Sequence, residues 1–95
     1  DRFYENVTRA NEFKNEIKGR ANEGTSVAEF LRDNPGAIEL AARGEAAERQ
    51  VSKLKAMRHD VVLRDGPDKA SKVRDVNLRI EAVMRGFNRE AERLQ

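Results

Sequence analysis

The chain has 95 residues, enough for one domain but without room for a second hydrophobic core. Charged residues make up 38% of it and aromatic residues 5%, so the apolar side chains must lie on narrow seams rather than in a thick globular core. The formal net charge of +2 comes from 19 basic and 17 acidic side chains mixed along the whole length. This mixture indicates a solvated surface of both signs rather than one basic patch.

The composition also limits the chemistry of the chain. It contains no cysteine, which excludes disulfides and cysteine-based zinc sites and leaves the redox compartment open. Because no apolar run approaches about 18 residues, we predict no membrane segment. The chain begins with Asp1, and apolar periodicity is present from Phe3 onward. We therefore expect residues 1–95 to be a single helical module taken from a longer protein.

An N-terminal helix is predicted over about residues 2–21. Its apolar residues are spaced three and four apart, which places them on one face of a helix of about five turns. These residues are Phe3, Val7, Ala10, Phe13, Ile17 and Ala21. Gly24 follows, at the position where a left-handed residue commonly ends a helix.

A short helix is predicted next, over about residues 26–33. Ser26 and Glu29 are three residues apart, so each side chain can cap the backbone amide of the other. The helix should end at Asp33, because the residue before a proline is pushed out of helical geometry. Asn34 and Pro35 instead predict the start of the following helix, as its cap and its first helical residue.

Two long helices, about 35–64 and 67–94, complete an all-α fold. We predict that they form an antiparallel hairpin, with the N-terminal and short helices packed along it. Both carry a heptad-like seam that faces the partner helix. The seam residues are Leu40, Gly44, Ala47, Val51, Leu54, Arg58, Val61, Val73, Val76, Ile80, Val83, Phe87 and Leu94. Asp65-Gly66 supplies the reversal, and Pro67 starts the second helix with Asp68 in its first turn.

The position of the reversal fixes the register of the hairpin. Facing residues should have numbers that total about 131, which places Gly44 opposite Phe87. Glycine inside a helix costs about 1 kcal/mol relative to alanine, but here it leaves room for the phenylalanine ring. Arg58 occupies a seam position where an apolar residue is expected. Its stem can pack while its guanidinium reaches Asp75 or another surface carboxylate, or its charge can set the register of pairing.

No group of side chains predicts catalysis, a metal site or a cofactor. His59 lacks a carboxylate, cysteine or second histidine at metal-ligand spacing, so we expect an exposed histidine. Glu45 and Glu48 are typical of solvated ion-pair partners on a helix. The segment Gly66-Pro67-Asp68-Lys69 has neither the spacing nor the preceding strand of a phosphate-binding loop. We therefore predict a noncatalytic chain without cofactors.

Binding to nucleic acid is the alternative hypothesis, and it depends on basic residues of the last helix. Arg85, Arg89 and Arg93 recur every fourth residue on one face, and Lys69 and Lys72 precede them. Such a stripe could follow a phosphate backbone. Acidic residues lie among these side chains, and no aromatic residues interleave to stack on bases, so an ordinary solvated face is favoured.

Three stretches of the chain carry a family resemblance: EFLRDNPGAIEL, ERQVSKLKAMRHDVV and KVRDVNLRIEAVMRGFNRE. With the Gly-Pro-acidic-Lys break between the last two, they resemble a helical domain found near the C-terminal ends of large polyvalent proteins of phages and prophages. The resemblance covers about residues 4–90. The positions that follow the family pattern are Phe30-Leu31, Asn34-Pro35, Leu54, Pro67, Ile80 and Phe87-Asn88.

This resemblance implies a noncatalytic module of a virion-associated or ejected protein, located in the virion or in the host cytoplasm. It implies docking of the parent chain onto other virion proteins, and the narrow apolar seams favour packing against copies of the chain or other chains. Asn88 matches the asparagine that usually follows the aromatic residue in the family. Its side chain suits either a hydrogen bond across the hairpin or a plain surface position.

Overall fold

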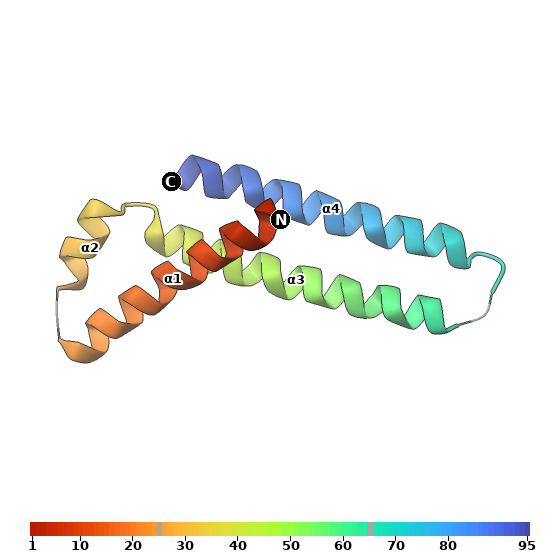
Figure 1. The fold of residues 1–95 in the computed structure, drawn as a ribbon, viewed down its shortest axis with the longest axis horizontal. Coiled ribbons are helices and arrows are strands. Elements are labelled where there is room, and N and C mark those ends of the chain that lie inside the picture. Colours follow the sequence, from red (N-terminus) through yellow and green to blue (C-terminus); the bar gives the residue numbers. More distant parts are fainter. Residues whose placement is uncertain (25, 65) are drawn as a thin grey trace.

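The fold is a long helical hairpin crossed by an N-terminal helix (Figure 1). A computed structural model describes residues 1–24, 26–64 and 66–95, which contain four α-helices and no strand. The helices are α1 (Arg2–Glu23), α2 (Val27–Asp33), α3 (Ala37–Leu63) and α4 (Lys69–Leu94). The predicted all-α class is confirmed. The molecule is elongated, with extents of 58 × 25 × 17 Å.

Helices α3 and α4 run antiparallel in the predicted register. A Cβ atom added to Gly44 would lie 3.3 Å from Cζ of Phe87, so these two residues face each other. Two ion pairs across the hairpin, with residue numbers that total 133 and 132, agree with this register: Arg43–Glu90 at 3.8 Å and Arg93–Glu39 at 3.5 Å. The short break between the helices therefore determines which side chains meet along the hairpin.

Helix α3 begins at Ala37, two residues later than predicted, because Asn34 ends α2 instead of starting α3. The Asn34 side-chain amide and its backbone N–H both donate to the carbonyl of Phe30, at 3.0 and 2.9 Å. The chain then turns through Pro35 and Gly36, where the N–H of Ala37 donates to the Asn34 carbonyl at 3.0 Å. An asparagine before a proline can serve either helix, and here it serves the preceding one.

Helix α4 likewise begins two residues later than predicted, at Lys69 rather than Pro67. Pro67 and Asp68 form a turn before the helix, and the N–H of Lys69 donates to the carbonyl of Gly66 at 3.4 Å. Asp68 thus occupies the cap position rather than the first turn, and its side chain makes no capping bond to a described backbone amide. Asp65, the other residue of the predicted reversal, lies outside the described residues.

The ends of α1 and α2 agree with the local sequence signals. Gly24 adopts a left-handed conformation with φ of 72° directly after α1, as its position predicted. The Ser26 hydroxyl accepts a hydrogen bond from the N–H of Glu29 at 3.2 Å and so caps α2. These two residues mark where the chain leaves α1 and enters α2.

Helix α1 crosses the hairpin obliquely, and only its first half packs against it (Figure 1). Phe3, Val7 and Ala10 are buried, and the ring of Phe3 meets that of Phe87 edge to face at 5.8 Å between centroids. Farther along the same stripe burial declines, until Ala21 is exposed. The stripe that the sequence predicted is therefore divided between a buried half and a half that diverges from the hairpin and is only partly covered by it.

The crossing point requires a residue without a side chain. A Cβ atom on Gly44 would overlap the Cβ of Ala10, and both residues are buried. The tighter neighbour of Gly44 is thus α1 rather than the Phe87 ring that the sequence register indicated. Glycine at this position lets the two helix backbones approach closely enough to bury the start of α1.

Helix α2 packs on α1 and not along the hairpin. The ring of Phe30 meets Phe13 at 6.0 Å between centroids, and the Arg20 guanidinium lies 5.1 Å from the centroid of Phe30. None of the seven α2 residues, all of which are described, is fully buried. The short helix therefore extends the half of α1 that projects from the hairpin.

Candidate interaction surface

The predicted hairpin seam is completed largely within one chain. Eight of its residues are buried: Leu40, Gly44, Ala47, Val51, Leu54, Val76, Ile80 and Phe87. Five are partly exposed: Arg58, Val61, Val73, Val83 and Leu94. The first half of α1 covers the seam around Gly44 and Phe87, so this part of the hairpin offers little apolar surface to another molecule.

Arg58 is tied to the neighbouring helix by a neutral partner. Its Nη1 donates to Oδ1 of Asn77 at 2.8 Å, instead of reaching Asp75 or another carboxylate as the sequence suggested. The side chain is only partly exposed, which agrees with a packed stem and a head directed toward solvent. Arg58 therefore contributes to pairing between α3 and α4 through a hydrogen bond to Asn77, and it forms no ion pair with a described residue.

The basic residues proposed for nucleic acid do not act as one free stripe. Arg93 is held by Glu90, with Nη2 2.8 Å from Oε2, and by Glu39 at 3.5 Å. The hydrogen bond from Arg93 lowers the pKa of Glu90 below its ordinary value of 4.5, and the same bond raises the pKa of Arg93. Arg93 is thus already neutralised by carboxylates of α3 and α4.

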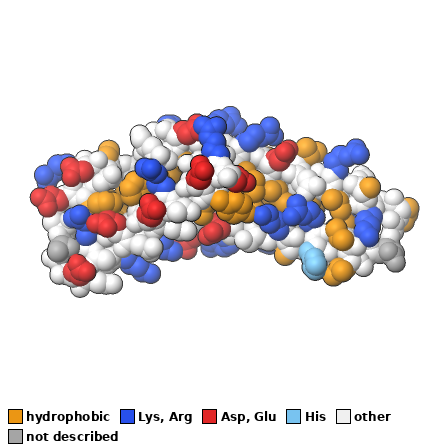
Figure 2. All heavy atoms as spheres, viewed as in Figure 1, with side chains coloured by type: hydrophobic (Ala, Val, Ile, Leu, Met, Phe, Trp, Pro, Cys, Tyr) orange, Lys and Arg blue, Asp and Glu red, His pale blue; other side chains and the backbone are white. Residues whose placement is uncertain are grey.

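The remaining four basic residues fall into two separate groups. Lys69 and Lys72 lie at the free end of the hairpin, where Lys72 pairs with Asp68 at 3.7 Å. Arg85 and Arg89 line a shallow pocket of α4 together with the ion-paired side chains of Arg2 and Glu92. On the face drawn in Figure 2, basic and acidic side chains are interspersed over much of the surface. This distribution agrees with the solvated mixed surface that the composition predicted.

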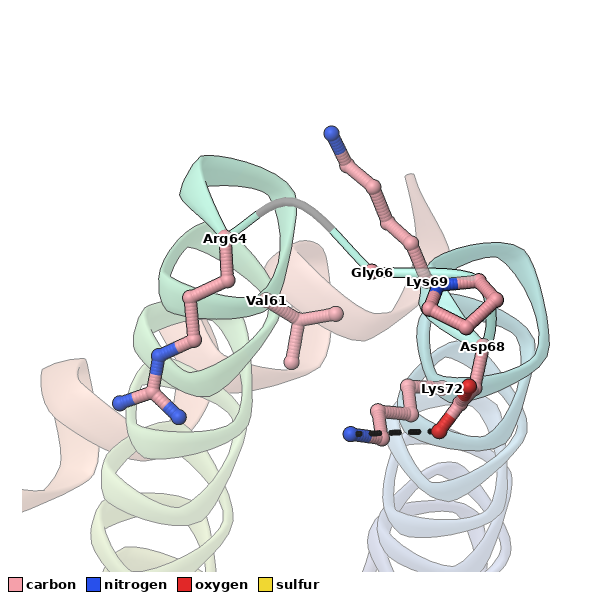
Figure 3. Close-up of a pocket in the computed structure, with 7 residues that line it drawn as sticks. Val61, Arg64, Gly66, Asp68, Lys69 and Lys72 are labelled. Carbon is pink, nitrogen blue, oxygen red and sulfur yellow. Dashed lines mark ion pairs between the residues drawn. The ribbon is translucent and has the colours of Figure 1, made fainter.

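The Gly-Pro-Asp-Lys segment lines a pocket of about 260 Å³ between the ends of α3 and α4. Figure 3 shows that its basic side chains point in different directions: Arg64 runs back along α3, Lys69 points away, and only Lys72 reaches into the gap. Because these cations do not converge on one point, the pocket lacks the geometry of a phosphate site. The segment serves as a corner of the fold.

The polar residues considered for catalysis or metal binding do not form a cluster among the described residues. His59 is exposed, and Glu45 pairs with Lys14 at 3.3 Å. Within residues 1–24, 26–64 and 66–95 there is no group of three or more histidine or acidic residues arranged to hold a metal ion. None of the four described helices is long and apolar enough to cross a membrane.

Asn88 bonds to α1 rather than across the hairpin. The Nδ2 of Asn6 donates to Oδ1 of Asn88 at 2.9 Å, and both side chains are partly buried. The hydrogen bond anticipated for Asn88 is therefore present, but its partner belongs to the N-terminal helix. It adds a polar contact beside the Phe3–Phe87 ring pair where α1 meets α4.

A strongly apolar depression of the surface forms a groove between the second half of α1 and the first turns of α3. It has a volume of about 430 Å³. Its lining consists of Lys14, Ile17, Lys18 and Ala21 of α1 and Ile38 and Ala41 of α3. The groove forms because α1 diverges from the hairpin after its crossing with α3. We call these six residues the α1–α3 groove.

Ile38 is the most unusual residue of the α1–α3 groove, because 59% of its surface is exposed. Ile17 and Ala41 are half-buried beside it, so an apolar knob projects next to an apolar hollow. The rim is charged: Lys14 pairs with Glu45 across the groove, whereas Lys18 forms no ion pair with any residue that the structure describes. This arrangement presents apolar surface to solvent with a charged border, as protein docking sites do.

The sequence pattern indicated two of the six residues of this groove. Ile17 and Ala21 belong to the predicted α1 stripe, but Ile38 and Ala41 were not singled out because they lie off the hairpin seam. The available signal was Ile38 itself, because a helix directs a residue two positions before the seam residue Leu40 away from the seam.

No protein-family model, no curated protein and no solved structure matches this chain.

Proposed function

We propose that this chain is a noncatalytic helical interaction module that packs against other protein chains through the α1–α3 groove. The observation that carries the proposal is the exposed Ile38 beside the apolar lining of that groove. Fully burying an isoleucine side chain contributes about 1.5–3 kcal/mol, so leaving one exposed at the edge of a groove favours association. A helix laid into the groove would cover Ile38 together with Ile17.

We also propose a context for the module. The resemblance of three stretches of the sequence to the helical domain of polyvalent phage and prophage proteins favours a virion-associated or ejected parent protein. Its partners would then be other virion proteins or copies of the chain, in the virion or the host cytoplasm. An elongated hairpin with a projecting α1–α2 arm suits such packing, because it exposes several helix faces at once.

The chain provides its own reporters for a test, because its three isoleucines are Ile17 and Ile38 in the groove and Ile80 in the core. The protein is labelled at isoleucine δ1 methyl groups, kept dilute, and titrated with an amphipathic helical peptide that carries leucines on one face and glutamates beside them. We expect the Ile17 and Ile38 signals to shift while Ile80 stays unchanged. Groove signals that do not move at millimolar peptide would contradict the proposal.

Nucleic-acid binding is retained as the second candidate because of one observation. Arg85 and Arg89 form no ion pair with any described residue. They line one shallow pocket together with Arg2 of α1, so three basic side chains lie close together. Adding duplex DNA to the same labelled sample tests this alternative. Binding with a steep loss of affinity on adding salt would favour it, because such a loss reports the release of counterions from phosphates.

A further inference from the structure

We propose that the chain seated on the α1–α3 groove is a second copy of this chain, related to the first by a two-fold axis that passes through the groove. The inference rests on the proposed function and names its partner. Three properties of the molecule lead to it: its surplus of exposed surface, the shape of the groove and the charges on the two rims.

The exposed area exceeds what an isolated chain of this size is expected to present. A folded monomer of 10.8 kDa exposes about 5,500 Å² by the usual scaling with mass, whereas this chain exposes 6675 Å². The radius of gyration is 17.1 Å, against about 12 Å for a compact domain of this length. The surplus of about 1,100 Å² is more than the ~800 Å² that each partner buries in a standard protein interface.

The groove is complementary to itself. It places a projecting side chain, Ile38, directly beside a hollow bordered by small residues such as Ala21 and Ala41. In a two-fold interface the same patch serves both partners, so each Ile38 can enter the hollow of the other copy. A hollow without a knob, or a knob without a hollow, would not allow this reciprocal fit.

The two rims of the groove carry opposite charges. Lys14 and Lys18 lie on the α1 side, and Glu45 lies on the α3 side, one heptad after Ile38 on the same face of the helix. A two-fold axis that runs along the groove, between α1 and α3, places the α1 rim of each copy over the α3 rim of the other. Lys18, which has no ion-pair partner among the described residues, then approaches Glu45 of the second copy, a carboxylate that also pairs with Lys14 of its own chain.

Sedimentation velocity over about 5 to 500 μM tests the inference, a range that detects dissociation constants near micromolar. The wild-type chain should form a dimer, and Ile38→Glu should weaken it by at least ~100-fold, because two isoleucines lose their burial. Leu78→Glu is the matched control: Leu78 is 54% exposed on α4, outside the groove, and its variant should dimerise like the wild type. Thermal melts of both variants at low concentration show that the monomer remains folded.

A charge exchange tests the two-fold geometry. Lys18→Glu and Glu45→Lys should each weaken the dimer by about 3- to 10-fold, because one change affects two symmetry-related pairs. The double variant should regain most of that loss. Dimerisation that survives Ile38→Glu, or a double variant as weak as the sum of the single ones, would overturn the arrangement.

The outcomes also separate this inference from the proposed function. A wild-type chain that stays monomeric at 500 μM while its Ile17 and Ile38 methyl signals shift with the helical peptide overturns the two-fold pairing and supports the interaction module. A monomer whose groove signals respond to no peptide overturns both. A dimer that dissociates on Ile38→Glu and recovers on charge exchange supports both.

Discussion

Ala10 and Gly44 meet at the point where α1 crosses α3, and their contact leaves no space for a side chain on the glycine. This close approach buries Phe3 and Val7 against the hairpin. It also sets the direction in which α1 leaves α3, and so it opens the α1–α3 groove beyond the crossing. The packing of two small residues therefore determines where apolar surface is exposed.

Gly44→Ala should destabilise the fold although alanine is the better helix former. The added methyl gains about 1 kcal/mol in helix propensity, but overpacking a buried contact costs about 1–3 kcal/mol. Gly86→Ala is the matched control in α4, because its new methyl group would meet no described atom of another element within 4 Å. Urea unfolding should show Gly86→Ala stabilised and Gly44→Ala destabilised. Equal stabilisation of both variants would show that the crossing is not tight.

Phe87→Ala should be among the most damaging single substitutions. The ring is buried, contacts Phe3 edge to face and lies against Gly44. Removing a buried phenylalanine costs about 3–5 kcal/mol, which is a large part of the stability of a small domain. Phe30→Ala removes the same ring from the half-buried α1–α2 contact and should cost about 1 kcal/mol. Thermal unfolding of the two variants compares these losses of stability. Similar losses would contradict the conclusion that the α1–α2 contact lies outside the hairpin core.

Arg58→Met should stabilise the hairpin or leave it unchanged. The substitution loses the bond to Asn77 but removes a charge from a partly buried seam position and keeps an unbranched apolar stem. Arg74→Met changes an exposed arginine of α4 and controls for the loss of charge. We expect the melting temperature of Arg58→Met to equal or exceed that of Arg74→Met. A clear decrease specific to Arg58→Met would mean that the bond to Asn77 specifies the pairing.

The ion pair between Glu90 and Arg93 predicts a pH dependence. Because the folded state lowers the pKa of Glu90, the unfolded chain binds more protons, and the pair contributes stability above pH 4.5 that is lost as the pH falls through the lowered pKa. The wild type should therefore melt slightly above Glu90→Gln at pH 7, and the difference should disappear in strong acid. A difference that is constant from pH 7 to pH 2 would assign the effect to packing instead.

The sequence predicted the helices and the hairpin register because both depend on local patterns. Heptad spacing defines the faces of α3 and α4, and the length of the break between them fixes the pairing of Gly44 with Phe87. Helix starts were less predictable. The Asn34 side chain can cap either the helix before it or the helix after it. It bonds to the carbonyl of Phe30, which comes within its reach only once α2 has formed.

The groove was not predictable, because spacing gives the face of a helix but not the angle at which two helices cross. The uniform stripe from Phe3 to Ala21 predicts a helix packed along its entire length, whereas the contact of Ala10 with Gly44 sends α1 across the hairpin. That contact joins residues far apart in the sequence. Ile38 consequently became part of a surface only when α1 was placed.

We propose that the α1–α3 groove is where this chain meets a second copy of itself. The most direct test measures relaxation of the isoleucine δ1 methyl groups by a soluble paramagnetic agent, in dilute and in concentrated protein. We expect strong relaxation of Ile38 and intermediate relaxation of Ile17 in the dilute sample, both reduced in the concentrated one, with the buried Ile80 protected throughout. If the molecules associate and Ile38 remains as accessible as before, another surface makes the contact and the proposed pairing through the groove is wrong.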